Sequence, residues 1–327
     1  MKQRTLFLTA LMGIAMVWSC DITETTDDAT VKSSLLAMIT ADDSSYTLDD
    51  WDDLEDMDFT LAKSAPVTLD SENSTLMFRD STSIWRFARR NMAKEREVTI
   101  DVLDDSTATG LITYRVTGTF HVKQFERVWT TDSTWERGDS IRFSEKPIDL
   151  TINRQVNFGL FEGRDGEEHW KPVSMTMAYG STGSALDIGS LEWIAGDSIR
   201  ILDDLQNEFY GWNNPLVFQL AYHNRVNVIL SNDTADEAEW VRGNWAYHPR
   251  MNGPEYRTRR NFHYVETLDN GDKVYSQSVD SPDRPRRMFR GSIKVVDHRT
   301  LFDHDYPSYS VVTLGFTYFL SRGVWDL

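Results

Sequence analysis

The chain has 327 residues, of which 40% are hydrophobic and 12% are aromatic, a composition typical of folded globular proteins rather than of disordered ones. Its formal net charge of −17 repels phosphate backbones and anionic lipid headgroups, which disfavours nucleic-acid binding and docking through a basic surface. A single cysteine excludes a disulfide within the chain, and the length is sufficient for two domains.

Residues 1–19 have the pattern of a secretion signal. Lys2 and Arg4 give a basic start, and residues 5–18 are an uncharged and mostly apolar run. The run has about 14 residues, whereas a helix that spans a bilayer needs roughly 20. A retained transmembrane segment is therefore the weaker interpretation, and we expect this segment to be removed after export.

The residue that follows this run is Cys20. The sequence from Val17 to Cys20, Val-Trp-Ser-Cys, resembles the lipobox of bacterial lipoproteins, although Trp18 departs from the small residue usual there. The resemblance implies cleavage before Cys20, lipidation of its thiol, and attachment by that lipid to a membrane of the bacterial cell envelope, facing the periplasm or the cell exterior. The alternative is an ordinary signal peptide that happens to end near a cysteine. Since Cys20 is the only cysteine, its place favours the lipoprotein interpretation.

Residues 20–30 are polar and lack apolar periodicity, so we interpret them as a lipidated tether. Apolar residues spaced three or four apart in 31–39 and 48–59 predict two helices. The second stretch is also rich in acidic residues. It lacks the turn glycine and the closing glutamate of a calcium loop, so the solvated face of an amphipathic helix is the favoured interpretation.

From residue 97 the apolar residues alternate with a period of two. Residues 98–102 and 111–122 predict an antiparallel hairpin, and further strands are expected at 125–130, 141–143, 148–158 and 170–179. Helices followed by strands predict an α+β domain over residues 31–197, with helices on an antiparallel sheet. This order resembles the NTF2-like fold, and the resemblance carries no catalytic residue to this chain.

The sequence pattern of residues 198–327 predicts strands and turns alone. Strands are expected at 216–220, 225–230, 261–267, 273–279, 290–296 and 310–319, with Asn270-Gly271 as a two-residue hairpin turn. This spacing resembles an immunoglobulin-like sandwich and predicts an all-β second domain, without the cysteine pair of many such domains. The pattern Trp-x-x-Gly-Asp-Ser-Ile-Arg occurs at 135–142 and again at 193–200, and we expect one hairpin structure at both places.

No catalytic motif with a tight spacing is present, so candidate chemical sites rest on local clusters. The most metal-like cluster consists of imidazoles and carboxylates near the last expected strand: Asp297, His298, Asp303, His304 and Asp305. Such groups could bind zinc or calcium. Asp and His are also ordinary turn residues, and a loop before the last strand is the favoured interpretation. We therefore expect no metal and no cofactor.

A second local cluster, Glu167, Glu168 and His169, could pair an acid with a base. Exposed carboxylates are abundant in so acidic a chain, and this cluster lies in a loop with two glycines. A solvated loop is therefore the favoured interpretation.

Basic residues gather in one part of the second half, against the overall charge. Arginine is suited to bidentate contacts with carboxylate, phosphate or sulfate groups. This anion-binding or partner-binding hypothesis concerns Arg257, Arg259, Arg260, Arg284, Arg286, Arg287 and Arg290. The alternative is charge balance on exposed strands, where ion pairs contribute little to stability.

These observations favour a lipid-anchored envelope protein that binds or scaffolds without catalysis. Its expected partners are the membrane, through the lipid on Cys20, and a protein, glycan or small ligand, with no nucleic acid. The alternative is an envelope hydrolase that uses carboxylates. An enzyme should have converging titratable groups, whereas a scaffold should have an exposed apolar patch.

Overall fold

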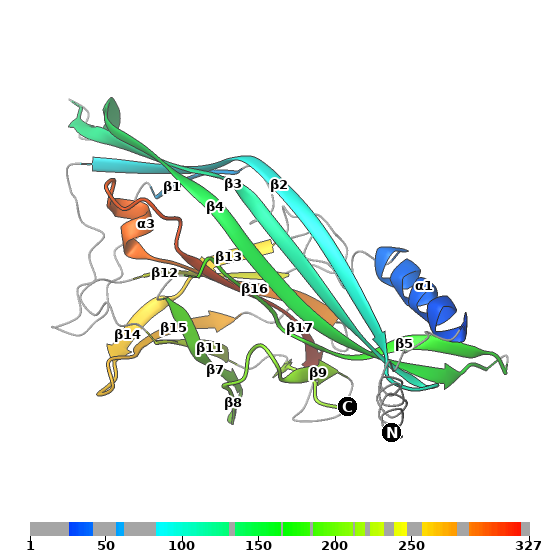
Figure 1. Ribbon diagram of the computed structural model, residues 1–327. Coiled ribbons are helices and arrows are strands. Elements are labelled where there is room, and N and C mark those ends of the chain that lie inside the picture. Colours follow the sequence, from blue (N-terminus) through cyan, green and yellow to red (C-terminus); the bar gives the residue numbers. More distant parts are fainter. Residues whose placement is uncertain are drawn as a thin grey trace, which may run out of the picture.

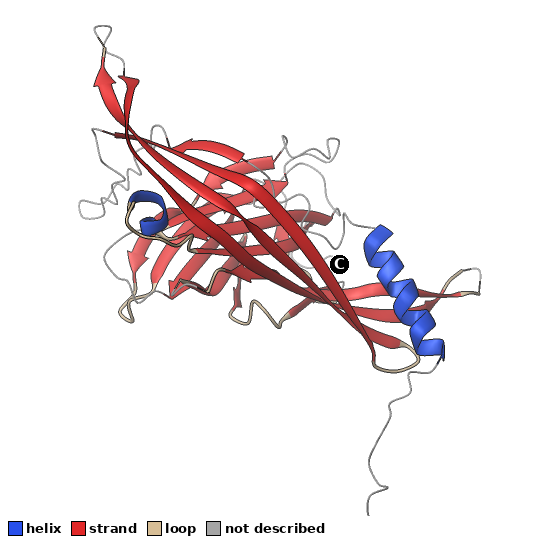
Figure 2. Cartoon of the chain, turned by 45° about the horizontal axis from the view of Figure 1, so that its top comes forward, coloured by secondary structure: helices blue, strands red, loops and turns tan. Residues whose placement is uncertain are grey.

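A computed structural model describes residues 26–41, 57–61, 83–130, 135–164, 166–183, 186–211, 213–219, 223–231, 239–246, 257–279 and 288–321. These residues are mostly strand. Their two helices are α1 (Thr26–Ala41) and the short α3 (His298–Phe302). The strands form two sheets, coloured red in Figure 2.

The large sheet has twelve strands within the described residues. Most of them follow one order: β1 (Met57–Leu61), β2 (Ser83–Val102), β3 (Thr107–Trp129), β4 (Trp135–Glu162), β6 (Ala178–Ser181), β17 (Val311–Ser321), β16 (Met288–Val296), β12 (Trp240–Ala246) and β13 (Arg257–Asn261). In addition, β5 (Glu168–Thr176) pairs with β4 and with β9 (Phe209–Gly211), and β10 (Val217–Gln219) runs parallel to β17.

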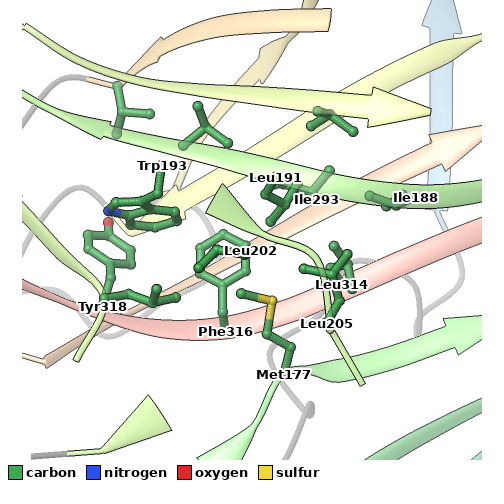
Figure 3. Packing of buried hydrophobic residues seen from close by; sticks show 14 of the residues in the cluster. Met177, Ile188, Leu191, Trp193, Leu202, Leu205, Ile293, Leu314, Phe316 and Tyr318 are labelled. Atoms are coloured by element: carbon green, nitrogen blue, oxygen red, sulfur yellow. The ribbon is translucent and has the colours of Figure 1, made fainter. Parts of the chain in front are cut away.

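The small sheet has five strands in the order β14 (His263–Thr267), β15 (Lys273–Val279), β11 (Asn224–Ser231), β7 (Asp187–Ala195) and β8 (Ser198–Leu202). It packs face to face on the part of the large sheet that contains β12, β16 and β17. In the buried layer between them, the ring of Trp193 stacks on Phe218 with centroids 4.1 Å apart and meets Phe316 edge-on at 5.4 Å. Figure 3 shows Trp193 and Phe316 within this layer, together with Tyr318.

The opposite face of the large sheet, called the inner face below, covers a second core. Helix α1 contributes Leu35 and Ile39, which are both fully buried in this cluster. The long strands β2, β3 and β4 curl over β12, β16 and β17 (Figure 1). The ring of Phe120 in β3 therefore reaches Tyr309, at a centroid distance of 4.8 Å.

The predicted hairpin in the first half is confirmed. Val98 in β2 pairs with Ile112 in β3, and the turn between the strands is fixed by Asp104. The Asp104 carboxylate accepts hydrogen bonds from the Thr107 hydroxyl at 2.7 Å and from the Ser106 amide at 2.8 Å. These bonds to the charged form lower the pKa of Asp104 to about 2.

The predicted α+β domain with helices on a sheet is wrong, and with it the NTF2-like fold. Helix α1 covers the expected 31–39 but begins at Thr26, inside the expected tether. Residues 57–61, the end of the second expected helix and two residues beyond it, are strand β1, while 48–56 lie outside the described residues. Met57, Phe59 and Leu61 alternate with polar residues, and this period of two matches the strand they form.

The immunoglobulin-like domain is also wrong as a separate unit. The described residues are mostly strand and form two packed sheets, but each sheet takes strands from both halves of the sequence. Val312 of β17 pairs with Ser181 of β6, and Val226 of β11 pairs with Trp193 of β7. Strand pairing therefore crosses the expected division at 197/198, which lies in the turn between β7 and β8. The sequence pattern of residues 198–327 favours a unit that folds alone, whereas these pairings predict that a fragment of them would lack partners for β17 and β11.

Candidate functional site

Cys20 and residues 1–19 lie outside the described residues, so the lipidation site stays a prediction from sequence. Among the residues that are described, no helix has the length and apolar character needed to cross a membrane.

The structure places two described members of the predicted arginine cluster, Arg260 and Arg290, on opposite faces of the large sheet. Strands β13 and β16 lie on either side of β12 in the large sheet. Arg260 is exposed and pairs with Gly243 on the face that packs against the small sheet, whereas Arg290 is half-buried on the inner face. The backbones of Arg257 and Arg259 pair with Ala246 and Asn244. The remaining three, Arg284, Arg286 and Arg287, lie outside the described residues.

A row of residues on the inner face brings Arg154 into line with polar residues from the second half. Arg154 continues the register that pairs Asn153 in β4 with Tyr179 in β6. Pairing then runs across the neighbouring strands from Ala178 to Gly315, from Gly315 to Ser292, from Ser292 to Asn244, and from Asn244 to Arg259. Opposed residues share a face of a sheet, so this row defines one line across the inner face, here called the Arg154 row.

Arg154 itself is a buried cation. Its side chain is only 5% exposed, and its Nη2 donates a hydrogen bond to the Gly315 carbonyl at 2.9 Å. Its buried Nε has no hydrogen-bond partner among the described residues. Burial and then the nearby charge of Arg290 lower the pKa of the Arg154 guanidinium to about 10, so both features disfavour its charged form.

The far end of the Arg154 row is polar and buried as well. The Asn244 amide nitrogen Nδ2 donates to the Ser292 hydroxyl at 3.1 Å, and both residues are less than a tenth exposed. The other amide atom, Oδ1, is buried without a hydrogen-bond partner within the described structure. Asn244 therefore keeps one side-chain atom available for a further contact, and in the flipped amide orientation that atom would be a donor.

The predicted metal cluster lies in residues 297–305, which form α3 and the turns beside it and are called the α3 corner below. The carboxylate of Asp297 caps this helix by accepting from the Arg299 amide at 2.8 Å, and it pairs with the Arg299 guanidinium at 2.7 Å. Asp303 Oδ1 accepts from the amide of Asp305 at 2.9 Å. Among the described residues, no group of three such side chains could hold a metal ion. These carboxylates fix the turns of the α3 corner.

The two histidines of this cluster make aromatic contacts instead. His298 lies against Phe302 with centroids 4.8 Å apart, and His304 stacks on Trp85 at 5.1 Å. The pKa of His304 is lowered by burial and then by the charges of Arg142 and Lys146, so the neutral ring is favoured.

The α3 corner also buries Lys146, which the sequence interpretation missed. Its ammonium donates to the carbonyls of Arg299 at 2.9 Å and Asp303 at 2.7 Å, closing the carboxyl end of α3. Burial lowers the pKa of Lys146 to about 8. Lys146 lies on the inner face of β4, opposite Phe120. The sequence signal for it is a charged residue at one of the alternating strand positions that are otherwise buried.

The predicted acid and base of Glu167, Glu168 and His169 are all exposed. They open β5 at the hairpin with β4, where the Gly163 amide donates to the Glu167 carbonyl at 2.7 Å and Glu168 pairs with Glu162. This arrangement corresponds to a solvated turn.

An apolar edge was also missed from the sequence. Strand β8 ends the small sheet, and Ile199 and Ile201 in it are 65% and 62% exposed. Arg200 between them faces the other way, pairs with Glu208 at 2.6 Å and lies over the ring of Tyr210. The only charged residue of β8 is therefore engaged within the fold.

Comparisons of the chain with family models, with curated proteins and with solved structures found no match.

Proposed function

We propose that this chain is a lipid-anchored protein of the bacterial cell envelope that binds a partner protein without catalysis. The lipobox-like sequence ending at Cys20 supports the anchor. The exposed edge of β8 supports partner binding, and it is the observation that carries this part of the proposal.

Edge strands present unpaired backbone N–H and C=O groups, and natural proteins usually protect them with charges, prolines or bulges. Strand β8 has the sequence Ser-Ile-Arg-Ile-Leu, and its arginine is directed to Glu208. Among the described strands, β8 pairs with β7 alone, so its other edge has no strand beside it. Two exposed isoleucines beside that edge suit the addition of an extended strand from another protein, where backbone bonds give affinity and the apolar side chains give specificity.

Site-specific photo-cross-linking in intact cells tests this proposal. A photoreactive residue replaces Ile199, or as a matched control Leu111, which is 42% exposed but lies in β3 between two paired strands. We expect a discrete cross-linked product from position 199 and none from position 111. Ile201→Lys should abolish that product, because a charged edge disfavours pairing. Equal products from both positions, or none from 199, would contradict the proposal.

The anchor is tested separately. Cys20→Ala should abolish incorporation of labelled palmitate and leave the precursor unprocessed or mislocalised, while Cys20→Ala protein that is still labelled would remove the lipoprotein interpretation. No observation on the described residues favours the alternative of a hydrolase.

A further inference from the structure

Arg154 has no carboxylate to balance its charge among the described residues. The strands that continue its row across the second half, β12, β13, β16 and β17, contain no Asp or Glu. Within the described residues, its hydrogen bond goes to a neutral carbonyl, that of Gly315. Buried charges in proteins are normally paired, because leaving water is costly for an ion. A buried arginine in this setting indicates that an anion belongs beside it.

The neighbouring positions leave the guanidinium free to meet such an anion. Between Arg154 and Ser292 the row contains only Ala178 and Gly315. The single side chain between them is therefore the methyl group of Ala178. The bond from Nη2 to the Gly315 carbonyl holds the guanidinium at β17, the strand next to the one that carries Ser292, and leaves Nε without a partner among the described residues.

Further hydrogen-bonding groups come from two more strands. The Ser292 hydroxyl belongs to β16 and the Asn244 amide to β12, and both are buried on the same face. Arg290, two residues before Ser292, is close enough to lower the pKa of Arg154 by its charge. Arg290 is only half-buried, so its own side chain keeps contact with solvent.

We propose that Arg154, Ser292, Asn244 and Arg290 form a binding site for a tetrahedral oxyanion, a phosphate or sulfate group carried by a ligand. Arg154 in β4 and Arg290 and Ser292 in β16 supply the donors, and the Asn244 amide in β12 donates to the Ser292 hydroxyl and so fixes it. Donors from separate strands suit an acceptor with oxygens in a tetrahedral arrangement better than a planar carboxylate. Arginine engages such groups through its fork of N–H donors. The site lies on the inner face and is distinct from the β8 edge.

Thermal unfolding of the full chain in different anions tests the proposal, with inorganic phosphate and sulfate as probes. Chloride at matched ionic strength controls for screening, and acetate tests for a carboxylate. Phosphate or sulfate should raise the Tm of the wild-type chain in a saturable way, by about 3 °C or more, whereas acetate should not. Arg154→Met should abolish this rise. In chloride it should leave Tm unchanged or higher, because it removes an uncompensated buried charge.

The matched control is Arg115→Gln, which removes an exposed arginine whose partner Asp149 lies on the neighbouring strand. It should keep the full anion-dependent rise. Ser292→Ala is a milder second variant, usable if Arg154→Met fails to fold, and it should weaken the apparent affinity at least threefold. The proposal is overturned if phosphate and sulfate do not raise the Tm of the wild-type chain, or if the Arg154 and Ser292 variants show the same rise as the wild type. It is also overturned if acetate raises the Tm as much as phosphate and sulfate do.

Discussion

Lys273 Nζ lies 3.2 Å from Glu239 Oε1 in the interior, and both side chains are only 4% exposed. Tyr275 completes this group by donating its hydroxyl to Glu239 Oε2 at 2.8 Å. Removing one partner of a buried ion pair leaves an uncompensated charge. We therefore expect Lys273→Met to lower the free energy of unfolding by about 3–5 kcal/mol, measured by urea denaturation.

The surface pair Arg115 and Asp149 provides the comparison, since these side chains are 57% and 61% exposed. Asp149→Ala should cost only about 0–1 kcal/mol. Similar losses in the two variants would show that the interior pair is solvated in solution.

Lys146 should make stability depend on pH in the alkaline range. Its folded pKa of about 8 lies below the usual 10.5 for lysine, so between these values the unfolded chain holds more protons. The free energy of unfolding should therefore rise between pH 8 and pH 10, by about 1–2 kcal/mol, as folded Lys146 loses its charge. Urea titrations at several pH values measure this slope. Lys146→Met should flatten it, whereas Lys171→Met, which removes an exposed lysine, should not.

Gly291 and Phe316 form a cross-strand pair in which the aromatic ring covers the glycine. A Cβ at position 291 would lie 2.5 Å from Phe316 Cε2, and that ring is held between Trp193 and Trp245. Gly291→Ala should destabilise the fold by about 1–3 kcal/mol through overpacking. Combined with Phe316→Leu, it should cost less than the sum of the two single changes, and strict additivity in urea denaturation would argue against the contact.

A fragment from Ser198 to Leu327 tests the division of the chain. It would leave β17 without β6 and β11 without β7, so in each sheet a central strand would lose the partner on one side. We expect it to lack a cooperative thermal transition by circular dichroism. A longer fragment from Met177 restores β6 and β7 and should recover part of the transition. A cooperative transition in the shorter fragment would establish an independent C-terminal unit.

Local patterns predicted several elements correctly because their causes are local. The turn at Asn270-Gly271 is present, and Gly271 has a φ of 90°, a conformation that glycine adopts without strain. Strand β15 occupies the expected residues 273–279. The order of strands could not be predicted, because a short strand such as β6 gives no signal of its neighbours β4 and β17.

The repeated pattern Trp-x-x-Gly-Asp-Ser-Ile-Arg shows the same limit. At 193–200 it forms the hairpin of β7 and β8, with Gly196 at a φ of 60°. At 135–142 the expected hairpin is wrong, because these residues are a continuous part of β4. There Gly138 lies against Val128 of β3, and this long-range pairing decides the structure.

One member of the Arg154 row, Arg154 itself, could be identified from the sequence. In 148–158 the apolar residues stand at every second position, and Arg154 interrupts them in the buried phase. That interruption marks a buried charge. Ser292 and Asn244 could not be found in the same way, because their place in this row depends on the order of the strands β6, β17, β16 and β12, which the sequence does not predict.

Strand β17 occupies residues 311–321, yet it pairs with β6 at 178–181 as well as with β16 and β10. A chain that emerges from its amino end therefore completes roughly 130 residues before β6 meets this partner. Until then, the edge of β6 that will receive β17 has no partner and can join a wrong strand. Contacts so distant in sequence form slowly, so folding is expected to be slow and to need protection from aggregation until residues 311–321 arrive.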